Sequence, residues 1–301
     1  MSRDHAPIAL FVYNRPWHTR QTIEALRRNE LAAQSDLIVF ADGPRDAAAA
    51  PAVAEVRDYA RSVTGFRSLR IIPREANLGL AESIIGGVTA VCGEFGRAIV
   101  LEDDLITAPH FLKFMNEALR MYEHDAMVGS VHGYWYPADR ELPETFFLRG
   151  ASCWGWATWS RAWQSFEPDG RKLLAQLRQR HLTHAFDLDG AIAYTRMLEM
   201  QIAGKIDSWA IRWHAAMFLD GRLQLSPGRS LVRNIGFDGS GTHCAESAAY
   251  GVDISPVPVD VRRIALQESA AARAALIRYH RSTRRSLASR ALGRLRRMVG
   301  G

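Results

Sequence analysis

Three consecutive carboxylates, Glu102, Asp103 and Asp104, directly follow the apolar run Ile99–Leu101. Adjacent carboxylates repel one another, and a divalent cation relieves that repulsion. Hard ions such as Mn²⁺ and Mg²⁺ prefer oxygen ligands and are commonly shared between one or two carboxylates and the phosphates of a substrate. The run therefore predicts a metal site that receives a diphosphate. The alternative is an acidic helix start, because Asp104 and Thr107 could cap a helix that begins near Pro109.

The first half of the chain alternates strand-like and helix-like segments, which predicts crossover units and a largely parallel sheet. Ligands of such sheets bind outside the carboxyl ends of the strands, so the residues just after each strand are the candidates for the site. They are Asn14-Arg15, Asp42-Gly43, Arg74 to Asn77 and the three acids at 102–104. The predicted strands are Ile8–Tyr13, Leu37–Ala41, Leu69–Ile72 and Ala98–Leu101, and the predicted helices are Pro16–Arg28, Ala50–Val63 and Leu80–Phe95.

Three of these strand-end residues have side chains suited to a nucleotide. Arg15 offers a planar fork of donors for a base carbonyl or a phosphate, and Asp42 can accept from an imide N–H or a hydroxyl. Asn77 precedes Gly79 in a loop where its amide, or the start of the next helix, could meet a donor substrate. Surface ion pairs for Arg15 and Asp42, and a simple turn with a helix cap for Asn77, are the alternatives.

The second half reads as an acceptor-side extension of one domain. Strands are predicted at Met127–His132 and Phe146–Arg149, and helices at Pro109–His124, Lys172–His181 and Ala191–Ala203. Between them lies a tryptophan cluster, Trp154, Trp156, Trp159 and Trp163. Spacings of three and four would place the last three on one face of a helix, in the core. Trp154, Trp156 and, further on, Trp209 are alternatively an aromatic platform for the apolar face of a sugar ring.

Two downstream residues complete the candidate site. Asp207, in the segment GKIDSWAIRW, is a candidate for the general base, and its alternative is the cap of a helix that begins at Ser208. Asp187 and Asp189 are the other candidates for the base. His243 follows Gly239 and Gly241, as suits a loop that closes over a phosphate or a metal, where an imidazole could coordinate. A plain surface histidine is the alternative.

The order of these motifs resembles that of GT-A glycosyltransferases. LFVYNRP at 10–16, Asp42-Gly43, NLGL at 77–80 and LEDD at 101–104 are similar to family-2 enzymes, and IVLEDDLITAPHFLKFM also resembles the N-acetylglucosaminyltransferase I type. The resemblance implies a GT-A α/β fold with a mixed sheet flanked by helices. It further implies that Arg15 and Asp42 hold the nucleotide, that Asp104 binds Mn²⁺ or Mg²⁺, and that Glu102 and Asp103 face ribose or sugar hydroxyls. The resemblance to these enzymes is good over residues 8 to 125.

Charge is unevenly distributed along the 301 residues. The net charge is +6, but residues 262–301 carry eleven arginines against Glu268, a local balance of +10, which leaves +6 − 10 = −4 for the rest. A tail with leucine and isoleucine among arginines suits a helix on an anionic membrane, with Leu276, Ile277, Leu287, Leu295 and Met298 on its apolar side. A solvated tail, or a helix docked on the acidic body, is the alternative.

These observations predict one GT-A domain at 1–261, with a nucleotide-sugar half at 1–125 and an acceptor half at 126–261, followed by a basic tail at 262–301. The expected reaction is an inverting transfer from a UDP-linked donor to a saccharide or lipid-linked acceptor in surface glycan synthesis. A glycoside hydrolase, a sugar-nucleotide pyrophosphorylase and a nucleic-acid-binding module are the competing classes, and nucleic acid is not expected as a partner because the body has no basic groove. Without a signal peptide or an apolar span of about 20 residues, a cytoplasmic or peripheral membrane location is expected.

Overall fold

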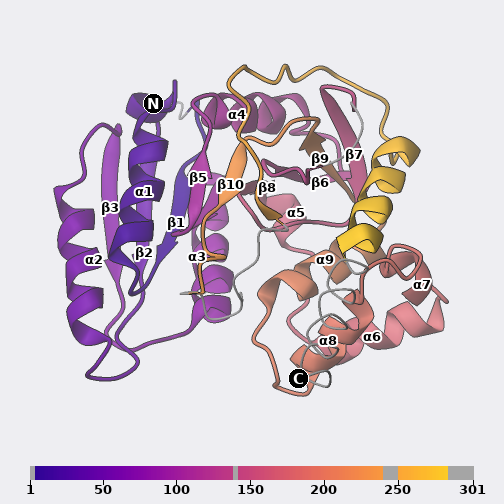
Figure 1. The fold of residues 1–301 in the computed structure, drawn as a ribbon, viewed down its shortest axis with the longest axis horizontal. Helices are drawn as coiled ribbons and strands as arrows, with labels where there is room; N and C mark the ends of the chain where they lie inside the picture. The colour runs from indigo at the N-terminus through magenta and orange to yellow at the C-terminus, as the bar shows by residue number, and fades with distance from the viewer. Residues whose placement is uncertain (1–3, 138–141, 240–249, 284–301) are drawn as a thin grey trace, which may run out of the picture.

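The computed structural model describes residues 4–137, 142–239 and 250–283, and it has a mixed α/β fold (Figure 1). An eight-stranded sheet has the order β3-β2-β1-β4-β8-β6-β9-β7, and β10 pairs with β5 in a separate two-stranded sheet. The strands are β1 (Ile8–Val12), β2 (Asp36–Ala41), β3 (Ser68–Pro73), β4 (Arg97–Glu102), β5 (Leu105–Thr107), β6 (Val128–His132), β7 (Thr145–Arg149), β8 (Trp156–Trp159), β9 (Leu223–Pro227) and β10 (Val232–Asn234).

Helices cover both faces of the large sheet. They are α1 (Pro16–Arg27), the short 3₁₀ turn η1 (Ala32–Gln34), α2 (Ala50–Ser62), α3 (Leu80–Phe95), α4 (Phe111–Met121), α5 (Ser160–Trp163), α6 (Gly170–Gln179), α7 (Thr183–Phe186), α8 (Tyr194–Ile202) and α9 (Trp209–Leu219). Helices α1, α2 and α4 pack on one face, and α3, α5 and α9 pack on the other. Helices α6, α7 and α8 form an outer layer against α9 and lie together at the side of the molecule away from β3 (Figure 1).

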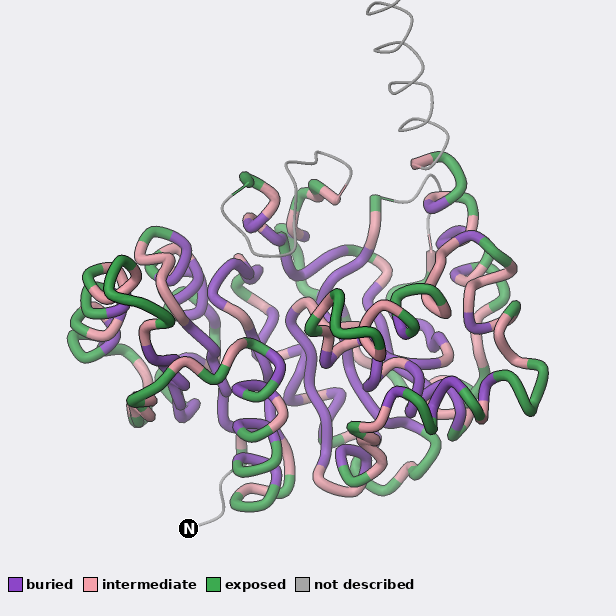
Figure 2. The backbone as a smooth tube through the Cα atoms, turned by 90° about the horizontal axis from the view of Figure 1, so that it is seen from below, coloured by how far each residue is buried: buried purple, intermediate pink, exposed green. Residues whose placement is uncertain are grey.

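The strands of the first half alternate their side chains between two apolar cores. In β1, Ile8, Leu10 and Val12 face the core under α1, while Ala9 and Phe11 face the core under α3. Strand β4 divides its residues in the same way, because successive side chains of a strand point to opposite faces. The central strands are therefore buried along their length, as Figure 2 shows. Parallel pairing of β1 with both β2 and β4 brings the carboxyl ends of these three strands side by side.

The predicted acceptor half continues this sheet. Strand β8 pairs antiparallel with both β4 and β6, and β9 pairs parallel with β6 and antiparallel with β7. The prediction that Trp156, Trp159 and Trp163 share one helix face is wrong, because Trp156 and Trp159 both lie in β8. Being three positions apart on a strand, they point to opposite faces, Trp156 toward α3 and α9 and Trp159 toward α4.

The first part of the predicted basic tail is docked on the protein. Residues 270–283 form a helix beside β7, drawn in yellow in Figure 1, with Ala272 and Leu276 buried against Phe146 and Leu148. Arg273 donates to both oxygens of Asp189, at 2.7 and 2.8 Å. The prediction of a separate tail beginning at residue 262, with Leu276 on a membrane-facing side, is therefore corrected for residues up to 283. Leu287, Leu295 and Met298 lie outside the described residues.

Arginine side chains further fix this C-terminal segment to acidic residues of the body. Arg263 makes two hydrogen bonds of 2.8 Å to the carboxylate of Asp125, and Arg281 donates to the backbone oxygen of Asp189. These contacts match the predicted alternative of a helix docked on the acidic body. Among the described helices, none combines the length and the apolar content that crossing a bilayer requires. The thiol of Cys92 is buried and that of Cys153 is half-buried, while Cys244 lies outside the described residues.

Candidate active site

An ion-pair cluster at the carboxyl ends of β1 and β4 joins three of the predicted residues. Arg15, the residue before helix α1, donates to both carboxylate oxygens of Asp103 and, at 2.9 Å, to Oδ2 of Asp104. Both aspartates are buried, and Glu102 beside them is half-buried. Asn14, also half-buried, is the residue between the end of β1 and this cluster. The predicted neighbourhood of Arg15 with the three acids is therefore present.

One guanidinium faces three carboxylates, and the local electrostatics reflect this imbalance. Burial raises the pKa of Glu102 to about 8, and the charges of Asp104 and Asp103 add to the effect. Burial likewise raises the pKa of Asp103 to about 6, although Arg15 opposes the shift. For Arg15, burial alone would lower the pKa, but Asp103 and Asp104 outweigh it and raise the pKa. The cluster keeps an excess of negative charge at neutral pH, which favours the approach of a cation.

The backbone of the acidic run is held from helix α1. The Thr22 hydroxyl donates to the backbone oxygen of Asp103 at 2.7 Å and accepts from the backbone N–H of Leu105 at 3.1 Å. Arg15, His18 and Thr22 are spaced by three and four residues, which places them on one side of the start of α1. That spacing is a signal from which the sequence could have indicated His18 and Thr22 as parts of the site.

A segment from far along the chain crosses the cluster. Strand β10 pairs antiparallel with β5, the strand that follows Asp104, and the N–H of Ile235 donates to the backbone oxygen of Asp104 at 2.9 Å. The next residue is Gly236, and a Cβ added there would stand 2.2 Å from Oδ2 of Asp104 and 3.2 Å from a guanidinium nitrogen of Arg15. Only a residue without a side chain allows this approach.

The same segment contacts helix α1 through a pair of polar side chains. Nε2 of His18 lies 3.0 Å from Oδ2 of Asp238. His18 is buried and the carboxylate of Asp238 is partly exposed, so the pair lies at the rim of the Arg15–Asp104 cluster. We call residues 234–238 the crossing segment. No sequence pattern connected the crossing segment with Asp104, because the position of this segment depends on the pairing of β10 with β5.

Asp42 makes four hydrogen bonds within the protein, and its contact with a nucleotide stays a prediction. Its Oδ1 accepts from the N–H groups of Gly43 and Leu78, both at 2.9 Å, and its Oδ2 accepts at 3.0 Å from the amide of Asn77 and from the N–H of Gly79. These four bonds use the acceptor sites of the carboxylate. Asp42 and Asn77 thus hold the loop 77–79 against the end of β2.

Asp207 is the predicted catalytic residue that the fold brings beside this loop. Its Oδ2 lies 3.7 Å from where a Cβ of Gly79 would be, and 61% of its side chain is exposed. Ser208, not Asp207, caps helix α9, because the Ser208 hydroxyl accepts from the N–H of Ile211. The alternative role of Asp207 as a helix cap is therefore excluded. A guanidinium nitrogen of Arg212 lies 4.0 Å from Oδ1 of Asp207.

The two other candidates for the base make contacts within the outer layer of helices. Asp187 accepts from the N–H of Thr195 at 2.7 Å, and Asp189 pairs with Arg273. A hydrogen bond from Arg273 lowers the pKa of Asp189, although the carboxylate itself is not buried. Both residues stabilise contacts of α7, α8 and the C-terminal helix. His243, the second predicted metal ligand, lies outside the described residues.

The three tryptophans predicted to bind the acceptor have different surroundings. Trp156 and Trp209 are only 1% and 2% exposed and stack on each other with 5.3 Å between ring centroids, so their prediction as acceptor contacts is wrong and they belong to the core. Trp154 is half-buried and meets Phe237 of the crossing segment edge to face, with 5.4 Å between centroids. Of the three, Trp154 alone lies next to the candidate site.

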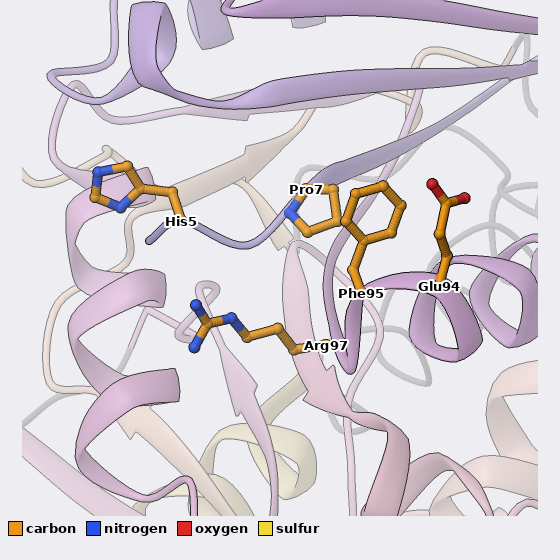
Figure 3. A pocket seen from close by; sticks show the side chains of 5 residues that line it. All are labelled: His5, Pro7, Glu94, Phe95 and Arg97. Carbon is orange, nitrogen blue, oxygen red and sulfur yellow. The ribbon is translucent and has the colours of Figure 1, made fainter. Parts of the chain in front are cut away.

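A hollow of about 470 Å³ lies at the opposite edge of the sheet (Figure 3). It is lined by residues before β1, at the end of α3 and at the start of β4, so it opens at the amino ends of the parallel strands: His5, Pro7, Glu94, Phe95 and Arg97. Ligands of such sheets bind at the other end. Within the described part of the chain, no group of three His, Cys, Asp or Glu side chains is arranged as a metal cage.

Comparison with known families identifies the class of protein. The model for "Glycosyl transferase family 2" matches residues 8–184, more than half of the chain. The protein belongs to this family and has a GT-A fold. The match includes the strand ends that carry Arg15, Asp42 and the acidic run, and it ends before Asp207 and the crossing segment. The finer resemblance to the N-acetylglucosaminyltransferase I type stays a prediction.

Among solved structures, the chain is similar to three structures of TarS from S. aureus. A TarS 1–349 structure has a TM-score of 0.35 and 11% identity over 58% of this chain, and the same fragment in complex with UDP-GlcNAc has a TM-score of 0.31 and 10% identity over 46%. A further TarS structure has a TM-score of 0.31 and 13% identity over 48%. The matches cover 49%, 37% and 24% of those chains, less than two thirds of each. A comparison with curated proteins gave no match.

Proposed function

We propose that this glycosyltransferase moves a sugar from a UDP-linked donor to a hydroxyl of a saccharide or lipid-linked acceptor, with inversion at the anomeric carbon. The observation that carries the proposal is the convergence of Arg15 with Asp103 and Asp104 at the strand ends, with Asp207 beside the neighbouring loop 77–79. A cationic fork, an acidic metal site and an exposed carboxylate are the groups that transfer from a diphosphate requires.

The donor diphosphate is expected to bind at Arg15 and Asp104. The carboxylate of Asp104 is the ligand that would hold Mn²⁺ or Mg²⁺ together with phosphate oxygens, and such a cation supplies charge neutralisation of the leaving diphosphate. Arg15 would then break its hydrogen bond to Asp104 and donate to the nucleotide instead, while keeping its bonds to Asp103. Glu102 and Asp103 are left to accept from ribose or sugar hydroxyls, in line with the family resemblance.

Asp207 is proposed as the general base of the transfer. The acceptor oxygen forms a bond to the anomeric carbon, its proton passes to the carboxylate of Asp207, and the bond to the diphosphate breaks with its electron pair leaving on the phosphate oxygen. The exposure of Asp207 leaves it accessible to an incoming hydroxyl. Trp154, which contacts the crossing segment, is proposed to pack against the acceptor sugar.

Calorimetric titration tests the donor half of the proposal. We expect the protein to bind UDP more tightly than GDP or CMP, and only with Mn²⁺ or Mg²⁺ present. Asp104→Ala should abolish the metal-dependent part, because a direct oxygen ligand is lost. Asp58→Ala, which removes an exposed carboxylate from α2, is the matched control and should bind normally. Unchanged metal-dependent UDP affinity in a folded Asp104→Ala protein would reject the assignment.

Product analysis tests the reaction itself. Incubation with a UDP-sugar and an acceptor should yield UDP and the glycosylated acceptor. We expect the acceptor to be of the bacterial type and the reaction to have a role in surface glycan synthesis. Free sugar released from a glycoside without any nucleotide would instead indicate a hydrolase, and pyrophosphate released from a nucleoside triphosphate would indicate a pyrophosphorylase. Nucleic acid is not expected to bind the described C-terminal segment, where Arg263 and Arg273 are paired with Asp125 and Asp189.

A further inference from the structure

A second, smaller cavity lies between the sheet, helix α9 and the C-terminal helix. Its volume is about 30 Å³, and residues from β6, β7, β9, α8, α9 and 270–283 line it. It belongs neither to the Arg15–Asp104 cluster nor to the hollow of Figure 3. Its walls include the loop after β7, which leads to Trp154.

Three side chains that line this cavity each have a buried polar atom without a hydrogen-bond partner among the described residues. These atoms are Nε2 of His132, Nε1 of Trp135 and Oε1 of Gln224, on side chains only 2%, 4% and 3% exposed. An unsatisfied buried polar group destabilises the folded protein, and native interiors leave few of them. Three around one small cavity indicate a ligand that satisfies them together.

The hydrogen-bonding character of these atoms defines the ligand. The indole N–H of Trp135 is a donor only, and Oε1 of Gln224 is an acceptor only. Burial lowers the pKa of His132 to about 3, so its ring is neutral and Nε2 either donates or accepts. The ligand must therefore both donate and accept, and a bare metal ion or an anion does not.

The charged residues that line the cavity are engaged elsewhere. Nε of Arg149 donates to the backbone oxygen of Phe218, and Oε1 of Glu268 accepts from the N–H of Arg149. The cavity therefore presents neutral polar groups to its contents. A volume of about 30 Å³ exceeds the roughly 10–15 Å³ needed for one water molecule, and it is too small for a sugar ring.

We propose that this cavity is an internal hydration site, in which one or two ordered water molecules bridge Trp135, Gln224 and His132. The bridging water accepts from the indole N–H and donates to the amide oxygen of Gln224. The site ties the segment after β6 to β9, next to the place where Leu276 of the C-terminal helix packs. The inference is independent of the proposed transfer reaction.

A crystal structure of the full chain, at a resolution that shows ordered water, tests the proposal directly. We expect water within about 2.7–3.2 Å of both Nε1 of Trp135 and Oε1 of Gln224. A dry cavity, or direct hydrogen bonds among the three side chains, would overturn it.

A double-mutant cycle measures the same bridge in solution. Trp135→Phe removes the donor and Gln224→Met removes the acceptor, so each should lower the unfolding midpoint, and together they should lower it by less than the sum of the two shifts. Trp213→Phe is the matched control, because Nε1 of Trp213 is also buried and unpaired among the described residues but does not line the cavity. Its shift should add to that of Gln224→Met. Additive shifts for Trp135→Phe and Gln224→Met would contradict the bridge.

Discussion

At the scale of single residues, the candidate site divides its carboxylates between two environments. Asp103 and Asp104 are buried and paired with Arg15, whereas Asp207 is largely exposed and has its closest cation at 4.0 Å. A paired, buried carboxylate is suited to hold charge in place, and an exposed one is accessible to an acceptor hydroxyl. The two environments support different roles for Asp104 and Asp207.

Asp207→Asn should abolish transfer while leaving nucleotide binding intact. The amide keeps the size of the carboxylate but does not accept a proton, and loss of general-base catalysis typically costs about 10²–10⁴-fold in rate. The measurement is kcat for UDP release in the presence of acceptor, together with UDP affinity by calorimetry. Asp187→Asn is the control, since its amide oxygen can still accept from Thr195, and it should stay active. An active Asp207→Asn enzyme would require the base to be found elsewhere.

Glu102 should make the folded state less stable as pH rises. Its pKa is raised from 4.5 to about 8 in the folded protein, so ionisation costs more in the folded than in the unfolded chain. The cost is absent below about pH 4.5 and grows until the pH passes the folded pKa of about 8. In the presence of a chelator, the unfolding midpoint of Glu102→Gln relative to wild type should therefore rise between pH 5 and pH 9. A difference that stays constant with pH would show that Glu102 is not destabilised by its neighbours.

Residue types and their positions after strands were enough to indicate Arg15 and the acidic run. They did not indicate the bonds from Asp42 to loop 77–79, because a carboxylate that binds a nucleotide and one that binds a turn look alike in sequence. Trp156 and Trp209 were misassigned for a similar reason. An aromatic ring can stack on a sugar or on another aromatic ring. Here Trp156 and Trp209 stack on each other in the core.

At the scale of elements, the first half of the fold was predictable within one or two residues. Strands β1, β2 and β4 are short, nearly continuous apolar runs, and helices α1 to α3 have an apolar period of about 3.6, so local pattern defines their limits. Strand β8 was not predictable, because its spacing of tryptophans suits a helix and only pairing with β4 and β6 favours the strand. Long-range pairing is invisible to local pattern.

The crossing segment illustrates this limit and allows a test. Gly236→Ala would place a Cβ 2.2 Å from Oδ2 of Asp104, a contact that a flexible carboxylate relieves by turning away. We therefore expect metal-dependent UDP affinity to fall at least tenfold while the unfolding midpoint changes little. The change leaves the chain's acids and bases untouched, so the effect would report the positions of Asp104 and of Arg15 beside it.

Gly93→Ala is the matched control for that variant. Nothing lies within 4 Å of a Cβ added at Gly93, in the interior of α3, and helix propensity favours alanine there by up to about 1 kcal/mol. It should raise stability slightly and leave UDP binding unchanged. Normal UDP binding by Gly236→Ala would show that the crossing segment does not position Asp104.

At the scale of the whole molecule, the arginine-rich C-terminal region has two parts. The described part is fastened to the body by Arg263, Arg273 and the buried side chain of Leu276. Residues 284–301 contain six further arginines and no acidic residue. Because Leu276 packs against the sheet edge, its apolar surface is not available to a bilayer in this structure. Any attraction to an anionic membrane must then come mainly from the charge beyond residue 283.

A protein that ends at residue 283 should therefore lose binding to anionic vesicles while keeping its fold and UDP affinity. Each arginine near such a surface contributes about 1 kcal/mol, so six of them are enough for salt-sensitive adsorption of the full chain. Co-sedimentation with vesicles that contain phosphatidylserine, at low and high salt, measures the difference, and neutral vesicles are the control. Leu276→Ala in the full chain should lower stability, as loss of a buried leucine does, without weakening vesicle binding. If the shortened protein still pellets with anionic vesicles, another surface makes the contact, and if the full chain never pellets, the membrane role is excluded.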